Sequence, residues 1–309
     1  MKGVILAAGK GTRLYPVTKA IAKPLLPMAN RMTMEYAFDQ MKECGITELC
    51  IVVGENEAEM KTTLGDGSQF GLNLTFVKQS EPLGLAHAVG FAKDFVGSDD
   101  FMLYLGDAIY GESLKPFVEK FKAEGAANLN LVKWVEDPRR FGVANIKDGR
   151  IVKLVEKPEV PESNMAMAGM YIFGPQLWDV LVDLKPSARG EYEITDAIQM
   201  LVDRGHLVIP GEYEGEWFDT GTLPSFLETT KFLTKGKSLV DPTAKVNAEF
   251  RGMVVIGANA IVDVLMVEDS VILPDSVVSS DGTIKRCLVG GNSIFSDDVE
   301  DKIFWDGKS

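Results

Sequence analysis

Short runs of apolar residues recur along the chain, separated by segments that have the hydrophobic spacing of an α-helix. Residues 33–44 show the helical spacing, and the apolar runs occupy residues 4–8, 49–53, 74–77, 101–105 and 129–132. An apolar run without alternation is typical of a strand buried on both faces, and strands that alternate with helices are typical of a parallel sheet. The sequence therefore predicts an α/β fold with a Rossmann-like, mostly parallel sheet covered by helices.

A different pattern begins near residue 236. A period of six residues connects the small residues Ser270, Ser276 and Gly282, and it also connects the aliphatic residues Ile256 with Val262 and Ile272 with Val278 and Ile284. Such a repeat is typical of a parallel β-helix built from hexapeptides. Because the repeat is imperfect, an ordinary short β-sheet is the alternative. We predict two domains, residues 1–236 and residues 237–309, of which the second is the small β-helix.

The charge of the chain argues against a nucleic-acid partner. With 45 acidic and 32 basic residues the formal net charge is -13, whereas nucleic-acid surfaces need clustered lysine and arginine to displace counterions. A small phosphate ligand in one cationic pocket remains compatible with this charge. No apolar run approaches the roughly 18 residues that a membrane span needs, and the N-terminal run lacks the layout of a signal peptide. We therefore expect a cytoplasmic protein without a membrane partner.

The cysteines and histidines indicate neither disulfides nor zinc. Cys44, Cys50 and Cys287 are odd in number and lack CxxC spacing, so buried free thiols are expected. His87 and His206 stand alone in the sequence, which argues against a histidine-based zinc site and leaves His87 with a structural role. Carboxylates are therefore the expected ligands of any metal ion.

A glycine-rich loop follows the first apolar run, in the segment ILAAGKGTRLYPVTKAIAKPLLP at residues 5–27. It does not fit a dinucleotide-binding loop, because Leu14 occupies the third glycine position of GxGxxG, and the P-loop pattern GxxxxGK[ST] does not occur. Its backbone N–H groups, the planar fork of Arg13 and the point charge of Lys23 are donors suited to a triphosphate. A surface turn with solvated basic side chains is the alternative interpretation.

The choice between a triphosphate-binding loop and a surface turn depends on a resemblance. The chain shares eight motifs, in the same order, with one known family. The opening segment is similar to the GxGTRL…KPLLP signature of the sugar-nucleotide pyrophosphorylases. The other matching motifs are EPLGLAHA at 81–88, YLGDAIY at 104–110, FGVA at 141–144, VEKP at 155–158, AGMYIF at 168–173, RGEYEITDAI at 189–198 and WFDTGT at 217–222. The resemblance covers roughly residues 1–230. It implies the nucleotidyltransferase fold, and several members of the family carry a left-handed β-helix tail.

Within the family, RGEYEITDAI and DTGT look like the glucose-1-phosphate thymidylyltransferases. Two positions depart from that subgroup. The opening reads Ala7-Ala8-Gly9 where that subgroup usually has Ala-Gly-Gly, and Ala8 there resembles the uridylyltransferase and archaeal branches. The later motif reads Gly-Asp-Ala, with Ala108 in the place of the asparagine that is common in the subgroup. The first departure leaves the choice between dTTP and UTP open, and the second removes a side-chain amide beside an expected metal ligand.

The resemblance implies that the chain joins a nucleoside triphosphate, dTTP or UTP, to a sugar 1-phosphate, with glucose 1-phosphate expected. The products would be a nucleotide sugar and pyrophosphate, and Mg2+ would be the cofactor. The oxygen of the sugar phosphate can attack the α-phosphorus directly, so the protein has to align two anions and neutralise charge. The alternative is a catalytically silent regulatory subunit that binds a nucleotide sugar. A homo-oligomer is expected, because stacked coils need capping.

Asp107 follows the apolar run 101–105 and a glycine, which places its carboxylate at the carboxyl end of a strand. The resemblance makes it an Mg2+ ligand together with Asp219. It assigns Arg13 to the charge that develops on the triphosphate and Lys23 to a bridge between the two phosphates. The remaining assignments are nucleotide binding by Ala8, Gly9, Gly11, Thr12, Gln79 and Gly84, and sugar-phosphate binding by Gly142, Glu156, Lys157, Gly169, Tyr171 and Arg189.

Some of these assignments have plain structural alternatives. Tyr171 could line the sugar pocket or pack within a strand. Glu156 and Lys157 could form an exposed charged pair before a proline turn, and any one of the glycines could serve only a turn.

Overall fold

The computed structural model describes residues 1–309 and divides into two compact units. The first contains Met1–Gly9 and Ala37–Trp217, and the second contains Lys10–Tyr36 and Phe218–Ser309. Most of the glycine-rich loop therefore belongs, by its contacts, to the same unit as the C-terminal residues. The domain boundary between residues 236 and 237 rests on the sequence pattern and stays a prediction.

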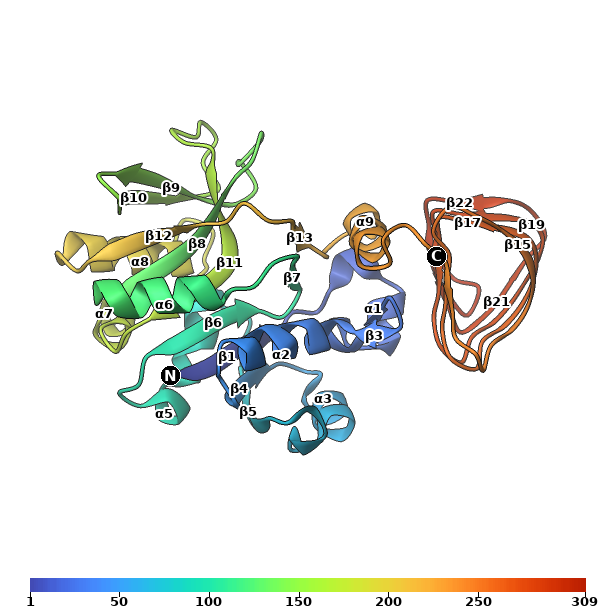
Figure 1. The fold of residues 1–309 in the computed structure, drawn as a ribbon, viewed down its shortest axis with the longest axis horizontal. Helices are drawn as coiled ribbons and strands as arrows, with labels where there is room; N and C mark the ends of the chain where they lie inside the picture. The colour runs from blue at the N-terminus through green and yellow to red at the C-terminus, as the bar shows by residue number, and fades with distance from the viewer. The chain divides into compact units, whose positions relative to one another are not determined.

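A nine-stranded sheet forms the centre of the first unit (Figure 1). Its strands are β1 (Lys2–Ala7), β4 (Glu48–Val53), β5 (Asn73–Lys78), β6 (Phe101–Leu105), β8 (Asn128–Trp134), β9 (Gly142–Lys147), β10 (Arg150–Glu156), β11 (Met165–Phe173) and β12 (Val208–Glu212). The order is β10-β9-β11-β6-β1-β4-β5, and β8 pairs with both β11 and β12. Two further short strands are β7 (Ala108–Tyr110) and β13 (Trp217–Asp219).

β1 lies at the centre of the parallel part of this sheet. It pairs in parallel with β4 on one side and with β6 on the other, and β5 continues beyond β4. Val4, Ile5, Leu6 and Ala7 are each at most 9% exposed, as expected of a strand covered on both faces. The loops after β1, β4 and β6 therefore leave the same edge of the sheet, where ligands bind in open parallel sheets. Apart from Ala8, which follows β1, all five predicted runs lie in strands, so that prediction is confirmed.

The rest of the sheet is mixed. β11 runs antiparallel to β6, β8 and β9, and β9 and β10 form a hairpin. Asp148 and Gly149 occupy the hairpin turn with φ values of 50° and 73°, the left-handed geometry of a two-residue turn that Asp-Gly favours. Antiparallel pairing arises here because this short turn leaves no room for a crossover helix.

Helices cover the sheet, and the α/β fold class is confirmed. α8 (Ile194–Asp203) packs against β10 through a buried stripe of Ile194, Ala197, Ile198 and Leu201, the spacing of one helix face. The other α-helices are α1 (Val17–Ala20), α2 (Thr33–Glu43), α3 (Glu57–Leu64), α4 (Leu85–Gly90), α5 (Lys93–Val96), α6 (Lys115–Glu124), α7 (Leu177–Asp183) and α9 (Leu223–Leu233). α2 matches the predicted helix at residues 33–44 to within one residue.

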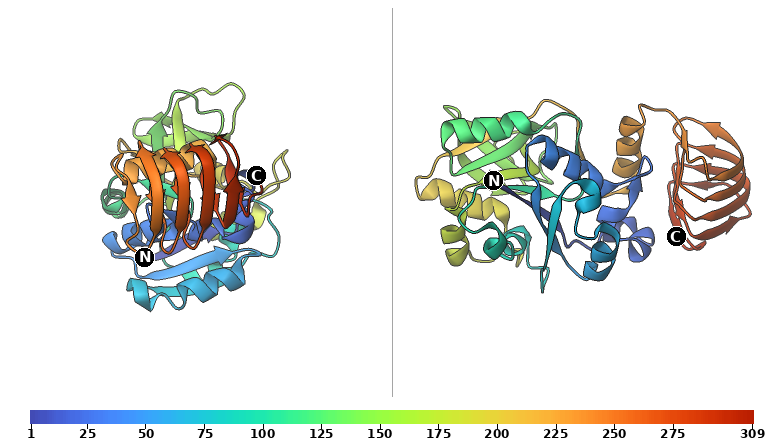
Figure 2. Two further views of the ribbon diagram at one scale, coloured as in Figure 1. Left: turned by 90° about the vertical axis from the view of Figure 1, so that its right-hand side faces the viewer. Right: turned by 60° about the horizontal axis from the view of Figure 1, so that its bottom comes forward.

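The C-terminal part of the second unit is a stack of parallel coils (Figure 2). One sheet contains β14 (Leu239–Val240), β16 (Val255–Ile256), β18 (Val271–Ile272), β20 (Leu288–Gly290) and β23 (Ile303–Trp305). The other contains β15 (Lys245–Arg251), β17 (Ile261–Glu268), β19 (Val277–Lys285), β21 (Asn292–Phe295) and β22 (Val299–Glu300). The pairing Leu239 to Val255 to Val271 advances 16 residues per coil.

The six-residue period marks the interior of these coils. Its aliphatic members are at most 1% exposed, and its serines Ser270 and Ser276 are fully buried at turns. The Ser270 hydroxyl donates to Glu268 O at 2.7 Å and accepts from Cys287 N–H at 2.9 Å. A small polar residue therefore satisfies backbone groups where the coil bends. The predicted β-helix is confirmed. The same unit also contains β2 (Pro27–Met28), β3 (Arg31–Met32) and the 3-10 turns η1 (Thr12–Leu14) and η2 (Lys23–Leu25).

The three cysteines are free. Cys50 and Cys287 are fully buried and Cys44 is half-buried. Burial raises the pKa of the Cys50 thiol to about 12, so this thiol stays protonated and unreactive at neutral pH. None of the helices has both the length and the apolar character that a membrane crossing requires.

Candidate functional site

The carboxyl end of β1 is held in place by the loop after β4. Asn56 Nδ2 donates to Ala7 O at 3.0 Å, and Asn56 Oδ1 accepts from Gly54 N–H at 3.0 Å. A Cβ added to Gly54 would lie 2.7 Å from Ala8 O, so only glycine lets the two loops approach this closely. Ala8 is half-buried and Gly9 is exposed. The predicted nucleotide-binding loop thus starts from a fixed strand end.

Asp107 is held at the neighbouring strand end, after β6. The preceding Gly106 donates its N–H to Leu6 O at 3.0 Å, and a Cβ on Gly106 would lie 2.9 Å from the same oxygen. On the other side, the Tyr104 hydroxyl donates to the carbonyl of Ala108 at 2.9 Å. Asp107 is half-buried between these two fixed neighbours. The expectation that its carboxylate stands at the carboxyl end of a strand agrees with this geometry.

Gly9 and Gly11 differ in what the fold requires of them. Gly11 has φ 63°, and a Cβ there would lie 3.2 Å from Lys23 Cβ and 3.2 Å from Thr18 Cγ2. The Thr18 hydroxyl also donates to Gly11 O at 2.7 Å. The turn and the base of the Lys23 side chain are therefore packed together. A Cβ on Gly9 would meet nothing within 4 Å, so the fold does not require glycine there.

The substitution Gly9→Ala tests whether Gly9 contacts the nucleotide, because it should affect binding without affecting stability. We expect an unchanged melting temperature and a rise of about tenfold or more in the KM for the nucleoside triphosphate, because a methyl group would stand where phosphate oxygens approach the backbone. Gly90→Ala is the control, since a Cβ there also meets nothing within 4 Å. Steady-state kinetics and thermal melts check both variants. An unchanged KM in Gly9→Ala would remove Gly9 from the binding loop.

Arg13 and Asp219 come together in the second unit. Asp219 Oδ1 accepts from Gly221 N–H at 3.0 Å. A Cβ on Gly221 would lie 2.8 Å from Arg13 Cζ and 2.9 Å from Asp219 Oδ1, so the guanidinium lies against the bare Cα of this glycine. Thr12 and Arg13 both belong to the short turn η1. Gly221, the glycine of the DTGT motif, therefore leaves the space that the Arg13 guanidinium occupies. The motif alone does not indicate this contact.

Gly221→Ala is expected to displace the Arg13 guanidinium, because the new methyl group would occupy its position. A displaced arginine aligns the triphosphate less well, and we expect kcat/KM to fall about tenfold, which corresponds to about 1.4 kcal/mol. The comparison variant is again Gly90→Ala. Wild-type kinetics in a folded Gly221→Ala protein would show that the position of Arg13 does not matter.

Gln79 and Gly84 lie close together in the first unit. Gln79 follows β5 and is 9% exposed, and its Nε2 donates to Gly84 O at 3.4 Å. Gly84 has φ 112°, and a Cβ there would lie 2.7 Å from Tyr192 N. On either side of Gly84, Tyr192 N–H donates to Leu83 O at 2.8 Å and Tyr192 O accepts from Ala86 N–H at 3.0 Å. The segment before α4 is therefore fixed against the chain that leads into α8.

Four of the six residues predicted to bind the sugar phosphate meet around one carboxylate, that of Glu156 at the end of β10. Thr195 donates its hydroxyl to Glu156 Oε2 at 2.6 Å. Lys157 Nζ lies 3.4 Å and Arg189 NH1 lies 3.5 Å from Glu156 Oε1. A Cβ on Gly142 would lie 3.2 Å from Glu156 Oε2. Two cations and one orienting hydroxyl thus converge on a half-buried acid.

Arg189 also contacts two carboxylates of its own motif. Its guanidinium lies 3.4 Å from Glu191 and 3.4 Å from Glu193. Glu193 is buried, and burial, followed by the negative charge of Glu156, raises the pKa of its carboxyl. Sequence reasoning did not select Glu193 or Thr195, although both lie in the matched motif RGEYEITDAI. An incoming phosphate would compete with these carboxylates for Arg189.

Gly169 and Tyr171 both lie on β11. Gly169 has φ 79°, and a Cβ there would lie 3.0 Å from Leu105 Cδ1. Tyr171 is 3% exposed, and its ring stacks on Phe173 with centroids 6.0 Å apart. Burial, followed by the negative charge of Glu156, raises the pKa of its hydroxyl. Tyr171 packs within the strand, and its assignment to the sugar site stays a prediction.

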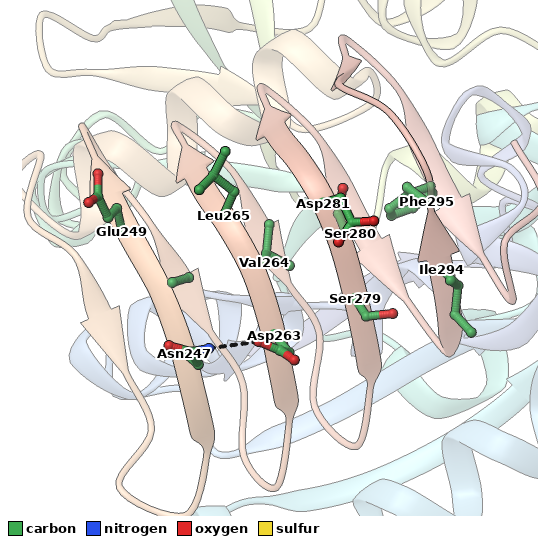
Figure 3. Close-up of a pocket in the computed structure, with 11 residues that line it drawn as sticks. Asn247, Glu249, Asp263, Val264, Leu265, Ser279, Ser280, Asp281, Ile294 and Phe295 are labelled. Atoms are coloured by element: carbon green, nitrogen blue, oxygen red, sulfur yellow. Dashed lines mark hydrogen bonds between the residues drawn. The ribbon is translucent and has the colours of Figure 1, made fainter.

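A hollow of about 620 Å³ on the β-helix contains none of the predicted residues. Figure 3 shows it over strands β15, β17, β19 and β21, with Asn247 Nδ2 donating to Asp263 Oδ1 at 2.7 Å. Exposed apolar side chains, Leu265 and Ile294, border polar ones. Its lining contains the carboxylates of Glu249, Asp263 and Asp281 but no histidine, cysteine or lysine.

The side chains available as metal ligands can be compared with what Mg2+ requires. No group of three or more histidine, cysteine or acidic side chains could hold a metal ion by itself. Mg2+ prefers six oxygens and in phosphate-transfer sites takes one or two carboxylates, with substrate phosphates and water as the other ligands. Asp107 and Asp219 each offer a carboxylate of this kind, and their assignment as Mg2+ ligands stays a prediction.

Comparison with known proteins agrees with these observations. The family model for nucleotidyl transferases matches residues 2–236. Agl11 of Haloferax volcanii, a low-salt glycan biosynthesis nucleotidyltransferase, is 45% identical over 77% of this chain and 68% of its own length. A glucose-1-phosphate thymidylyltransferase of Streptomyces griseus is 38% identical over 94% of this chain and 87% of its own.

A solved structure is also similar. A Bacillus anthracis protein, provisionally assigned as a glucose-1-phosphate thymidylyltransferase and crystallised with sucrose, superposes with a TM-score of 0.71. It is 39% identical, and the match covers 76% of this chain and 95% of that one.

Proposed function

Because the chain belongs to the nucleotidyl transferase family, we propose that it transfers the nucleotidyl group of dTTP to glucose 1-phosphate and releases pyrophosphate, with UTP as the second choice of nucleotide. One observation supports this proposal above the others. Glu156, Lys157 and Arg189 converge beside Gly142, an arrangement with an acceptor for sugar hydroxyls and two cations for a phosphate.

The reaction needs no nucleophile from the protein. An oxygen of the sugar phosphate attacks the α-phosphorus, a new P–O bond forms, and the bond to the β-phosphate oxygen breaks as pyrophosphate leaves in line. Arg13 stabilises the charge that develops on the triphosphate, and Lys23 bridges the α-phosphate and the sugar phosphate. Backbone N–H groups of the loop from Ala8 and Gly9 through Gly11 and Thr12 hold the triphosphate. Alignment and charge neutralisation then supply most of the rate.

Mg2+ is the proposed cofactor, with Asp107 and Asp219 as its protein ligands. The ion would neutralise charge on the phosphate oxygens of the bound triphosphate. Ala108 offers no side-chain ligand, because a methyl group has no donor atom, and the residue is buried. The proposed side-chain ligands are therefore carboxylate oxygens.

At the sugar end, Glu156 accepts hydrogen bonds from sugar hydroxyls, with Thr195 holding its second oxygen. Lys157 and Arg189 bind the phosphate. In the structure Arg189 lies near the carboxylates of Glu156, Glu191 and Glu193, so a bound phosphate would compete with them for the guanidinium.

We also propose that the protein is a homo-oligomer. Four apolar side chains on the β-helix are unusually exposed: Ile261 at 45%, Val277 at 43%, Leu265 at 61% and Ile294 at 77%. A second copy that covered this face would remove apolar area from water. Light scattering at about 10 μM is expected to give a multiple of 33.8 kDa; a mass of one chain at that concentration would contradict it. The cytoplasm is the proposed compartment, since free cysteines are typical of reducing surroundings.

A substrate panel tests the function. Pyrophosphate release is measured with each nucleoside triphosphate against the 1-phosphates of glucose, mannose, galactose and N-acetylglucosamine, in the presence of Mg2+. The fastest turnover is expected with dTTP and glucose 1-phosphate. Silence across the panel, with retained binding of a nucleotide sugar, would favour the regulatory subunit and contradict catalysis.

A further inference from the structure

His87 contacts a predicted nucleotide ligand directly. Its Nδ1 lies 3.2 Å from Nε2 of Gln79. The His87 ring is packed edge-on against Phe91 with centroids 5.0 Å apart and is stacked on Tyr192 with centroids 6.0 Å apart. The imidazole is therefore held between two aromatic rings, and its position relative to the Gln79 amide is fixed by packing.

The partners of Gln79 determine which way its amide points. Gly84 O can only accept a hydrogen bond, so the amide end that faces it at 3.4 Å must be the NH2 group. The same NH2 group faces Nδ1 of His87 at 3.2 Å, and that nitrogen must therefore accept. A neutral imidazole that accepts at Nδ1 carries its proton on Nε2. His87 and Gly84 together thus take both protons of the amide nitrogen.

The consequence is a carbonyl oxygen with a fixed direction. Gln79 Oε1 is used by none of the hydrogen bonds that the side chain makes. If the two acceptors at Nε2 were absent, the amide could rotate by half a turn and present NH2 in place of the oxygen, because the two ends are nearly equal in size. With both present, only an acceptor is offered to a ligand at this position.

We propose that His87 is a positioning residue that locks the Gln79 amide with its oxygen toward the nucleobase and so selects bases with an imide N3–H, thymine and uracil, over cytosine. This inference rests on the proposed function, in which Gln79 contacts the base. Thymine and uracil carry a donor at N3, whereas cytosine carries an acceptor there, and two acceptors facing each other leave a polar group unpaired.

Two substitutions of His87 distinguish the effect of its hydrogen-bond acceptor from the effect of its ring. His87→Asn loses the ring but keeps an oxygen acceptor close to the Nδ1 position, while His87→Phe keeps the ring and loses the acceptor. We expect His87→Phe to lower the ratio of kcat/KM for dTTP to that for dCTP by about fivefold or more, mainly through KM for dTTP. The KM for glucose 1-phosphate should stay within about twofold. His87→Asn should recover most of the discrimination.

A binding measurement, which does not need turnover, tests this inference independently of the proposed reaction. Calorimetry of dTTP and dCTP with Mg2+ is expected to show the same loss of preference in His87→Phe and its recovery in His87→Asn. Equal preference in the wild type and His87→Phe, or an equal loss in both variants, would overturn the positioning role. Absence of transfer in the wild type with intact dTTP preference would contradict the proposed reaction and leave this role standing.

Discussion

Asp107→Asn is expected to lower Mg2+-dependent pyrophosphate release by at least about 100-fold, or about 2.7 kcal/mol of transition-state stabilisation. The substitution keeps the size of the side chain but removes the charge that attracts Mg2+. The backbone on either side, at Gly106 and Ala108, is fixed by hydrogen bonds that do not involve the carboxylate. The variant should therefore fold normally and lose activity through the metal, which a Mg2+ titration of the rate measures.

The control for this variant is Asp99→Asn. Asp99 is an exposed partner of Lys2 at 3.3 Å, and exposed ion pairs contribute about 0–1 kcal/mol to stability. Its kinetics should equal those of the wild type. If Asp107→Asn turned over at a near-normal rate and with the same Mg2+ dependence, Asp107 would not be a metal ligand.

Lys23→Ala should lose at least about tenfold in kcat/KM, equivalent to about 1.4 kcal/mol. Lys23 begins η2, and its Cβ packs beside Gly11, so the side chain starts from the predicted phosphate-binding loop. Its bridge is made most strongly when both phosphates share the charge of the transition state, and kcat should fall as well as the affinity for substrate. Initial rates at varied concentrations of both substrates separate the two effects.

Lys19→Ala, in the nearby helix α1, is the matched variant. Lys19 Nζ lies 4.8 Å from the centre of the Tyr15 ring, and no phosphate contact is assigned to it. We expect at most a twofold change in kcat/KM, about 0.4 kcal/mol. Equal effects of the Lys19 and Lys23 substitutions would indicate a general loss of positive charge and contradict a specific bridge.

Much of the fold follows from local sequence patterns. Residues 4–7 of the first apolar run form the buried part of β1, because a strand covered on both faces has no place for polar residues. The six-residue period of the tail predicts the coils because each turn of the β-helix needs a small residue, such as Ser270, where the backbone bends. These patterns depend on neighbours within one element and are visible without a structure.

Other features depend on residues that are distant in the sequence. The dipeptide Asp148-Gly149 is a sequence signal for the antiparallel hairpin. No local sequence signal indicates that this hairpin pairs with β11. The burial of Tyr171 could not be predicted, because an aromatic residue on a strand has the same sequence signal whether it lines a pocket or packs in a core. The contact between His87 and Gln79 joins α4 to the end of β5, and neither residue alone indicates it.

The central claim is that this chain transfers a nucleotidyl group to a sugar 1-phosphate, and the most direct test follows the α-phosphate. With α-labelled dTTP, glucose 1-phosphate and Mg2+, the label should appear in a dTDP-sugar in a one-to-one ratio with released pyrophosphate. Omission of the sugar phosphate should abolish both products. Label that appeared in dTMP or dTDP, or that stayed in dTTP while the protein was folded and nucleotide-bound, would contradict the claim.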